Sequence, residues 1–313
     1  MKAIVLAAYG SPENLQYRDV TKPVPAPDEV LVNIRAAAVN HIDYEKALGA
    51  MKQVFPLEFP WIPGYDFAGL IEAVGEQVKN VAVGDEVYGT STQSGTYADY
   101  LVIHPEQIAR KPSTLSFIEA ASVPVSAETA WQVLFEHARL SPGQTVLIHG
   151  GGGAVGTYAV QLAHQAGATV IVTASAKTKD SLALLGADQI IDYQSKPFET
   201  LVSGVDAVID LVGGAMQQRS YGVIKEGGYL VSINQPVSPE RAAQYGIHAV
   251  FAELHPTREG LSRIAQQIDA GQLRIHLGNV YPLSQAAQAW QELMGEPVSG
   301  RQKQSGRIVL QMG

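Results

Sequence analysis

The order of apolar and polar residues changes about one third of the way along the chain. Before that point, short apolar or alternating runs such as EVLVNIRAAAV (29–39) and DEVYGT (85–90) are separated by clusters of Pro and Gly. Runs of this length, bounded by turn residues, are typical of strands, so this part is expected to be rich in β-structure. From about Ser122 onward, apolar strands alternate with helical segments. This alternation predicts an α/β fold whose parallel sheet is covered by helices on both faces.

The clearest strand–helix–strand unit lies between Thr145 and Lys177. Strands are expected over 145–149 and 169–174, with a helix over 154–166 between them. One stripe of that helix has the spacing of a face packed against a sheet, namely Val155, Ala159, Leu162, Ala163 and Ala166. Further strands are expected over 189–193, 206–212, 228–234 and 306–311, and further helices near 179–185, from about Leu261 and over 284–293.

Composition narrows the class of protein. The chain has 313 residues, enough for about two domains at roughly 100–200 residues each. A net charge of -8 without any run of Lys and Arg argues against a nucleic acid or an anionic membrane as partner. The lack of cysteine removes disulfides, thiolate nucleophiles and cysteine-based zinc sites. No apolar stretch approaches the ~20 residues of a membrane span, and no signal-peptide pattern is seen, so a cytoplasmic protein is expected.

Glycines are concentrated where the strand over 145–149 ends. Gly151-x-Gly153-x-x-Gly156 follows this strand and opens a helix, which is the fingerprint of a dinucleotide-binding Rossmann unit. We expect Gly151 to permit the tight turn, Gly153 to let a pyrophosphate approach the backbone, and Gly156 to let the helix pack closely. The N–H groups at the helix start, at Ala154 and Val155, then face the phosphates.

The residues after the second strand of this unit predict which nucleotide binds. An NAD site usually has an Asp or Glu there that accepts a hydrogen bond from the ribose 2′-OH. The segment VTASAKTKD has no acid before Asp180 and carries Lys177 and Lys179 instead. Lysine near a helix start is disfavoured by the helix dipole, and a ribose 2′-phosphate would resolve this, with Ser175 as hydroxyl donor and Lys177 as the charge. NADPH is therefore favoured over NADH, with ordinary surface lysines as the alternative.

A nicotinamide enzyme with this layout resembles the medium-chain dehydrogenase/reductase superfamily, and the resemblance covers essentially the whole chain. It implies a Rossmann dinucleotide-binding domain, a doubly wound parallel sheet, over residues 122–256. It also implies a β-rich GroES-like catalytic domain formed by residues 1–121 and 257–313.

Zinc alcohol dehydrogenases of that superfamily hold their catalytic zinc with a Cys and with the His of a Gly-His-Glu motif. The corresponding places here read VNHID (39–43) and PGYDFAG (63–69), and the four-cysteine structural-zinc loop is absent. No metal is therefore expected. A different metal site made by His41, Asp43 and Asp66 is an alternative that no paired motif supports.

The pattern VNHID…PGYDFAGLIEAVG together with HGGGGAVG is similar to the zinc-free quinone oxidoreductase branch, which includes the zeta-crystallins and the alkenal reductases. The resemblance implies hydride transfer from NADPH to a quinone or to the β-carbon of an α,β-unsaturated carbonyl. Homodimers are usual in this branch, so a homodimer is a possible assembly. An NADPH-binding structural or sensor protein with little turnover is the alternative, because zeta-crystallins are also lens proteins.

Without zinc or a thiol, a substrate carbonyl needs a neutral hydrogen-bond donor. Asn40 is the first candidate, because its amide has two N–H groups and it matches the usual Asn of the branch. Asp43 is a further candidate that matches the branch, and its expected role is to fix the loop and its neighbours. Tyr44 offers a phenol, although the tyrosine of the branch corresponds to Glu45. The resemblance also implies cofactor contacts by Asn40, Ser126, Thr129 and Tyr193, with a half-buried aromatic at a strand end as the alternative for Tyr193. Val212, Gly213, Ser232 and Ile233 are expected at the carboxyl ends of strands, where ligands of open α/β sheets bind.

One motif points to a different enzyme class. YGVIK (221–225) fits the YxxxK of short-chain dehydrogenases, where the Tyr donates a proton and the Lys lowers its pKa. The glycine motif begins too late in the chain for that class, and YxxxK follows it too soon. We therefore expect Tyr221 to face solvent or to pack on a helix. No residue stands out as the donor of the proton that completes an enone reduction.

Overall fold

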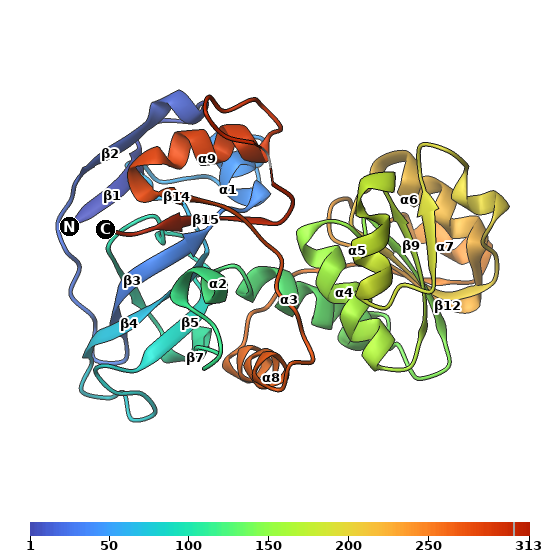
Figure 1. Ribbon diagram of the computed structural model, residues 1–313, viewed down its shortest axis with the longest axis horizontal. Coiled ribbons are helices and arrows are strands. Elements are labelled where there is room, and N and C mark those ends of the chain that lie inside the picture. The colour runs from blue at the N-terminus through green and yellow to red at the C-terminus, as the bar shows by residue number, and fades with distance from the viewer. Residues whose placement is uncertain (303) are drawn as a thin grey trace. The chain divides into compact units, whose positions relative to one another are not determined.

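A computed structural model describes residues 1–302 and 304–313 of the chain (Figure 1). These residues form two compact units. The first unit consists of Met1–Val125 together with Pro256–Gly313, and the second is Ser126–His255. The boundary lies in helix α3 (Pro124–Trp131), slightly later in the chain than residue 121. Both ends of the chain therefore contribute to the first unit.

The first unit is built on a seven-stranded sheet with the order β14-β15-β3-β4-β5-β7, and β6 also pairs with β3. Its strands are β3 (Val30–Ala38), β4 (Asp66–Val74), β5 (Glu86–Thr90), β6 (Tyr100–Ile103), β7 (Ile108–Arg110), β14 (Leu277–Pro282) and β15 (Arg307–Gln311). A separate antiparallel pair is formed by β1 (Lys2–Leu6) and β2 (Leu15–Asp19). The last strand, β15, runs parallel to β14 and antiparallel to β3, so the tail completes the sheet. The expected β-rich character is confirmed.

The helices of the first unit have between five and 12 residues. They are α1 (His41–Ala47), α2 (Phe117–Ala121), α8 (Arg258–Asp269) and α9 (Ala286–Leu293), with 3-10 turns η1 (Pro12–Asn14), η2 (Pro105–Gln107) and η7 (Leu283–Gln285). Trp290 of α9 is fully buried in the same core as Phe67, Tyr97 and Tyr281. Because α1 starts right after β3, the residues between them are held between two regular elements.

The second unit is a six-stranded parallel sheet with the order β10-β9-β8-β11-β12-β13. Its strands are β8 (Thr145–His149), β9 (Thr169–Ala174), β10 (Gln189–Asp192), β11 (Val205–Asp210), β12 (Ile224–Ser232) and β13 (His248–Phe251). The first strand, β8, lies between β9 and β11, so the strand order reverses beside it. Dinucleotides bind at such a reversal in doubly wound sheets. The predicted Rossmann fold is confirmed.

Helices cover both faces of this sheet, with α4 (Ala154–Gln165) and α5 (Lys179–Leu184) on one face and α6 (Gly214–Ser220) and α7 (Pro239–Tyr245) on the other (Figure 1). Shorter helical segments are η3 (Gln132–His137, a π-helix), η4 (Ala176–Thr178), η5 (Phe198–Thr200) and η6 (Tyr221–Val223). The stripe predicted for α4 is buried at Ala159, Leu162 and Ala163. Tyr158 and Val160 are buried as well, so the covered surface is broader than that stripe. No helix within the described residues is both long enough and apolar enough to cross a membrane.

Candidate active site

A buried polar network surrounds Asn40, the residue just before α1. One N–H of its amide donates to Asp66 Oδ2 (3.2 Å), and its Oδ1 accepts from the guanidinium of Arg307 (2.8 Å). Arg307 also donates to Asp66 Oδ2 (2.9 Å). The amide is thus fixed at both of its ends, and at most one N–H is left to donate to a substrate.

Asp66, the first residue of β4, is the acceptor at the centre of this network. Its other oxygen, Oδ1, accepts from Thr90 Oγ1 (2.9 Å) and from the backbone N–H of Val125 (2.9 Å). Burial raises the pKa of Asp66, whereas Arg307 and these donors oppose that rise. A carboxylate that receives donors at both oxygens beside a guanidinium is stabilised as an anion. The pair therefore places one positive and one negative charge in the core of the first unit.

Asp43 lies in the first turn of α1 and is fully buried. Its Oδ2 accepts from the backbone N–H of Asn40 (2.8 Å) and from the phenol of Tyr97 (2.9 Å). Burial raises the pKa of Asp43 to about 7. The phenol of Tyr97 also accepts from Trp290 Nε1 (3.2 Å), which connects α1 to the core. The carboxyl is fully buried and holds the backbone of Asn40 in place.

Tyr44, the third candidate, is half-buried and packs edge-on against Trp290, with ring centroids 5.8 Å apart. This contact gives the ring a packing role beside the core of the first unit. It offers no support for the phenol as a proton donor.

The zinc chemistry of related dehydrogenases does not fit these residues. The sequence has no cysteine, and the described residues contain no group of three His, Cys, Asp or Glu that could hold a metal ion. The alternative site at His41, Asp43 and Asp66 also fails as a donor set, because Asp66 is already neutralised by Arg307. The cation beside Asp66 is a guanidinium contributed by the last strand.

The glycine loop of the second unit differs in one respect from the prediction. The residue with left-handed backbone is Gly150 (φ +76°), not Gly151. Gly151 is needed for space, because a Cβ there would lie 2.9 Å from the side chain of Val172. A Cβ at Gly156 would lie 2.3 Å from the carbonyl oxygen of Gly150, so α4 packs directly on the loop. Gly153 caps α4 in an extended conformation. The loop is therefore a tight backbone turn that ends at a helix start, the arrangement that binds a pyrophosphate.

His149, which the sequence did not single out, is the last residue of β8 and directly precedes this loop. Its ring is fully buried, with Nδ1 at 3.0 Å from Thr173 Oγ1 and Nε2 at 2.9 Å from Ser220 Oγ. Burial lowers its pKa to about 4, so the ring is neutral. The carbonyl of Thr173 accepts from the N–H groups of Gly150 and Gly151 (3.1 Å each). The turn is thereby tied to β9.

The residues predicted for the ribose phosphate lie at adjoining strand ends. Ser175 follows β9 and is half-buried, Lys177 is exposed, and Tyr193 follows β10 with its ring half-exposed. The N–H of Tyr193 donates to the carbonyl of Ala174 (3.3 Å), so the two strand ends lie side by side. A hydroxyl, an ammonium and a phenol are thus available at one edge of the sheet.

At the ends of β11 and β12, one predicted contact has a different role. Ser232 is fully buried, and its hydroxyl donates to Asp210 Oδ2 (3.0 Å). Asp210 Oδ1 accepts from the N–H groups of Val212 (3.1 Å) and Gly213 (2.8 Å). Ser232 therefore shapes the Val212–Gly213 turn through Asp210, while Val212 itself and the half-buried Ile233 retain accessible surface.

Helix α3 carries the two residues predicted near the nicotinamide. Ser126 and Thr129 are both buried. Among the described residues, Ser126 Oγ has no hydrogen-bond partner. A buried hydroxyl without a partner is costly, so a ligand atom that bonds to it would remove that cost. This orphan hydroxyl and the glycine loop fit a dinucleotide.

The YxxxK pair is separated by its contacts. Tyr221 is fully buried, its phenol accepts from the N–H of Ser238 (2.9 Å), and Lys225 pairs with Asp206. The expectation that Tyr221 faces solvent is wrong, and the alternative that it packs on a helix is correct, since its ring centroid lies 6.1 Å from that of Tyr245 in α7. Its burial in an apolar cluster explains the difference.

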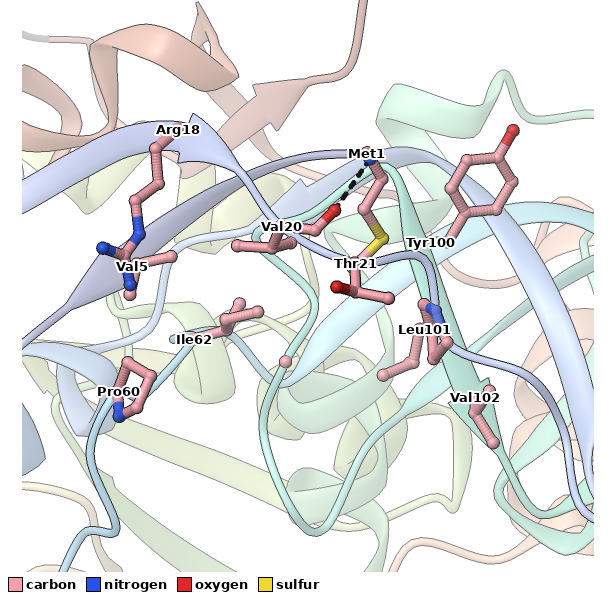
Figure 2. Close-up of a pocket in the computed structure, with 12 residues that line it drawn as sticks. Met1, Val5, Arg18, Val20, Thr21, Pro60, Ile62, Tyr100, Leu101 and Val102 are labelled. Carbon is pink, nitrogen blue, oxygen red and sulfur yellow. Dashed lines mark hydrogen bonds between the residues drawn. The ribbon is translucent and has the colours of Figure 1, made fainter.

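A cavity of about 410 Å³ lies beside β1 and β2 in the first unit (Figure 2). Its apolar lining includes Val5, Val20, Ile62 and Leu101, and Arg18 brings a charge to its edge. The residues predicted for the active site are not among those that line it, so it does not enter the chemistry.

These features define the class of protein: a GroES-like unit with a polar network at Asn40, joined in one chain to a Rossmann unit, is the architecture of medium-chain dehydrogenases and reductases. Two family models match, an alcohol dehydrogenase GroES-like domain over residues 26–113 and a zinc-binding dehydrogenase domain over residues 185–302.

Relatives and solved structures refine this class. Quinone oxidoreductase of Sus scrofa is 30% identical, with 94% of each chain covered. NADPH-dependent alkenal/one oxidoreductase of Arabidopsis thaliana is 32% identical over 96% of this chain and 78% of that protein. The chain spans 63% of the 2-methylene-furan-3-one reductase of Solanum lycopersicum, at 40% identity over 76% of its own length.

Two solved structures cover nearly the whole chain. Quinone oxidoreductase from Coxiella burnetii superposes with a TM-score of 0.90 at 34% identity, covering 99% of each chain. Escherichia coli quinone oxidoreductase complexed with NADPH superposes with a TM-score of 0.88 at 26% identity, covering 99% of this chain and all of that one. The chain belongs to the quinone oxidoreductase family of the medium-chain dehydrogenase/reductase superfamily.

Proposed function

We propose that the protein is an NADPH-dependent, metal-free reductase that transfers a hydride to quinones or to the C=C bond of α,β-unsaturated carbonyls. The observation that carries this proposal is the Asn40 network. It presents a fixed amide where metal-dependent relatives have a Lewis acid, and the ligand set for zinc does not fit. The names of the relatives, quinone and alkenal/one oxidoreductases, support the same substrate class.

The second unit supports NADPH as the cofactor. The turn at Gly150–Gly156 would hold the pyrophosphate, and Ser175, Lys177 and Tyr193 would hold the 2′-phosphate and ribose. The buried hydroxyl of Ser126 would take a hydrogen bond with the nicotinamide amide. The structure in complex with NADPH among the relatives supports this choice.

Bound NADPH supplies the hydride, and the residues of the chain bind, orient and polarise the substrate. The free N–H of Asn40 would donate to the substrate oxygen. Negative charge grows on that oxygen as the hydride arrives, so a fixed donor binds the transition state more strongly than the substrate. Arg307 and Asp66 hold the amide before the substrate arrives, which avoids reorganisation during the reaction.

The test is oxidation of NADPH and of NADH with a panel of quinones and 2-alkenals, with metal content measured in the same preparation. We expect turnover with both acceptor classes, a higher kcat/KM for NADPH than for NADH, and less than stoichiometric zinc. Tight NADPH binding without turnover on any acceptor would favour the structural or sensor protein. A preference for NADH would contradict the role of Lys177.

The cytoplasmic location and the homodimer remain predictions. Fractionation of cells that express the protein and light scattering of the purified chain address them separately.

A further inference from the structure

The reduction needs a proton as well as a hydride, and the residues described so far do not supply it. Hydride addition to the β-carbon of an enone leaves an enolate, and hydride addition to a quinone leaves a hydroquinone anion. Each must gain one proton. Asp43 is covered, the phenol of Tyr44 is packed beside Trp290, and Asn40 can donate a hydrogen bond but cannot lose its proton.

Lys46 lies on α1, one turn after Asp43. Its Nζ is 5.0 Å from the ring centroid of Phe55 and 5.0 Å from that of Tyr65. The side chain is half-buried, and its ammonium makes no ion pair in the part of the chain that the structure describes. The two aromatic rings hold the ammonium in place, and no carboxylate of the described residues forms an ion pair with it.

The surroundings of Lys46 connect it to Asn40. Tyr65, which packs under the ammonium, directly precedes Asp66, which holds the amide of Asn40. The start and the end of α1 therefore both lie against the dipeptide Tyr65–Asp66. The amide of Asn40 and the ammonium of Lys46 thus belong to the two ends of α1 and to one region of the first unit.

Apolar side chains are exposed shortly after Lys46 in the sequence. The segment after α1 exposes Leu48 (44%), Val54 (72%) and Phe55 (50%). A planar apolar quinone or enone can stack on such side chains. The exposed part of the Phe55 ring would therefore hold the ring of the substrate. The same Phe55 ring contacts the ammonium of Lys46.

We propose that Lys46 is the proton donor of the reduction and that Phe55 and Tyr65 hold its ammonium beside the substrate. The proposal rests on the proposed function. An N–H bond of the ammonium breaks as a C–H or O–H bond forms on the substrate anion. The neutral amine then takes a proton from water, which its half-exposed position allows. NADPH is oxidised to NADP⁺ and the substrate gains one hydride and one proton, so atoms and charge balance.

The charges near Lys46 support this role. Burial lowers the pKa of Lys46, and Asp43 on the same helix opposes this shift. Tyr65 faces it from the segment before β4; burial raises the pKa of that phenol, so it stays neutral, and Phe55 carries no charge. An ammonium with a lowered pKa is a stronger acid than an exposed lysine, which favours proton transfer near neutral pH.

The experiment compares Lys46→Met, Lys46→Arg and the wild type over a range of pH with the quinone or enone that the wild type reduces fastest. Arginine keeps the charge and the contact with the rings but does not release a proton. We expect both variants to lose kcat by about 10²-fold, the scale of one general acid. Wild-type kcat should fall as pH rises through the lowered pKa of Lys46, and this alkaline limb should be missing in Lys46→Arg.

Lys79→Met is the matched control, because it removes an exposed lysine of the first unit from the loop between β4 and β5, outside α1 and the segment that follows it, and it should leave kcat unchanged. Retained kcat in Lys46→Met, or in Lys46→Arg, would overturn the proposal. If a variant fails to fold, the wild-type profile decides: kcat that stays constant up to pH 10 would also overturn it. If none of the quinones or 2-alkenals supports NADPH oxidation by the wild type, the proposed function is refuted instead.

Discussion

Arg307 illustrates at the residue scale how one side chain controls two others. Its guanidinium neutralises Asp66 and fixes the oxygen of the Asn40 amide. Both members of the ion pair are buried, with side chains 9% and 0% exposed. Removing either charge would leave the other buried and unpaired, which lowers the free energy of unfolding. The network is therefore a stability element and a positioning element at once.

Substitution at Arg307 should separate these two effects. Arg307→Met leaves Asp66 buried without its cation, which is expected to cost about 3–5 kcal/mol of stability. The double variant Arg307→Met with Asp66→Asn removes both charges and should recover most of that loss. Its kcat should stay low, because the amide of Asn40 has lost its partners. Thermal unfolding and steady-state kinetics measure the two effects, and a double variant with wild-type kcat would show that the network has no role in positioning.

The residues of this network could be predicted only in part. Asn40 and Asp43 follow from the resemblance of VNHID, and the Gly151–Gly156 spacing follows from the fingerprint. Arg307 lies 267 residues after Asn40 in the sequence, and no local pattern links the two. The left-handed backbone of Gly150 could not be predicted, because four consecutive glycines leave open which of them adopts it.

At the scale of elements, the turn from β8 into α4 depends on close backbone packing. A Cβ at Gly156 would meet the carbonyl oxygen of Gly150 at 2.3 Å and the Cα of Gly151 at 2.7 Å. Both are backbone atoms of the loop, so they cannot move aside as a flexible side chain does. The position of α4 and the shape of the loop are coupled at this glycine.

Gly156→Ala should therefore weaken both stability and cofactor binding. We expect a loss of about 1–3 kcal/mol, the usual cost of overpacking, together with a higher Kd for NADPH. Gly222→Ala is the control, since a Cβ there meets its nearest atom at 3.8 Å. Urea unfolding and fluorescence titration with NADPH are the measurements. Unchanged Kd in Gly156→Ala would contradict the assignment of this turn to the pyrophosphate.

Elements with strong periodicity were predicted from the sequence, and weak ones were not. β8, α4 and β9 are apolar or amphipathic over their whole length and lie close to their predicted bounds. β13 reads HAVF and is half-exposed at the edge of the sheet, so its sequence carries little strand signal. α1 spans seven residues of mixed polarity and is held by tertiary contacts of Asp43.

At the scale of the whole molecule, the two units are built from the chain in different ways. The first unit needs both ends, because β15 pairs with β3 and Trp290 and Tyr281 fill the same core as Phe67. The second unit comes from one continuous segment, Ser126–His255. Its apolar cluster takes all of its members from that segment, including Leu147, Phe198, Val208, Tyr221 and Leu230.

This difference predicts how fragments of the chain behave. A fragment of residues 126–255 contains all six strands of its sheet and its own core, so it should fold alone, unfold cooperatively and bind NADPH without reducing any acceptor. A fragment of residues 1–125 lacks β14, β15 and α9, which leaves β3 with an open edge and the core without Trp290; it should not fold. Circular dichroism during heating and NADPH fluorescence test both. Cooperative unfolding of the 1–125 fragment would show that the tail is dispensable, and a 126–255 fragment without secondary structure would show that the Rossmann unit depends on the rest of the chain.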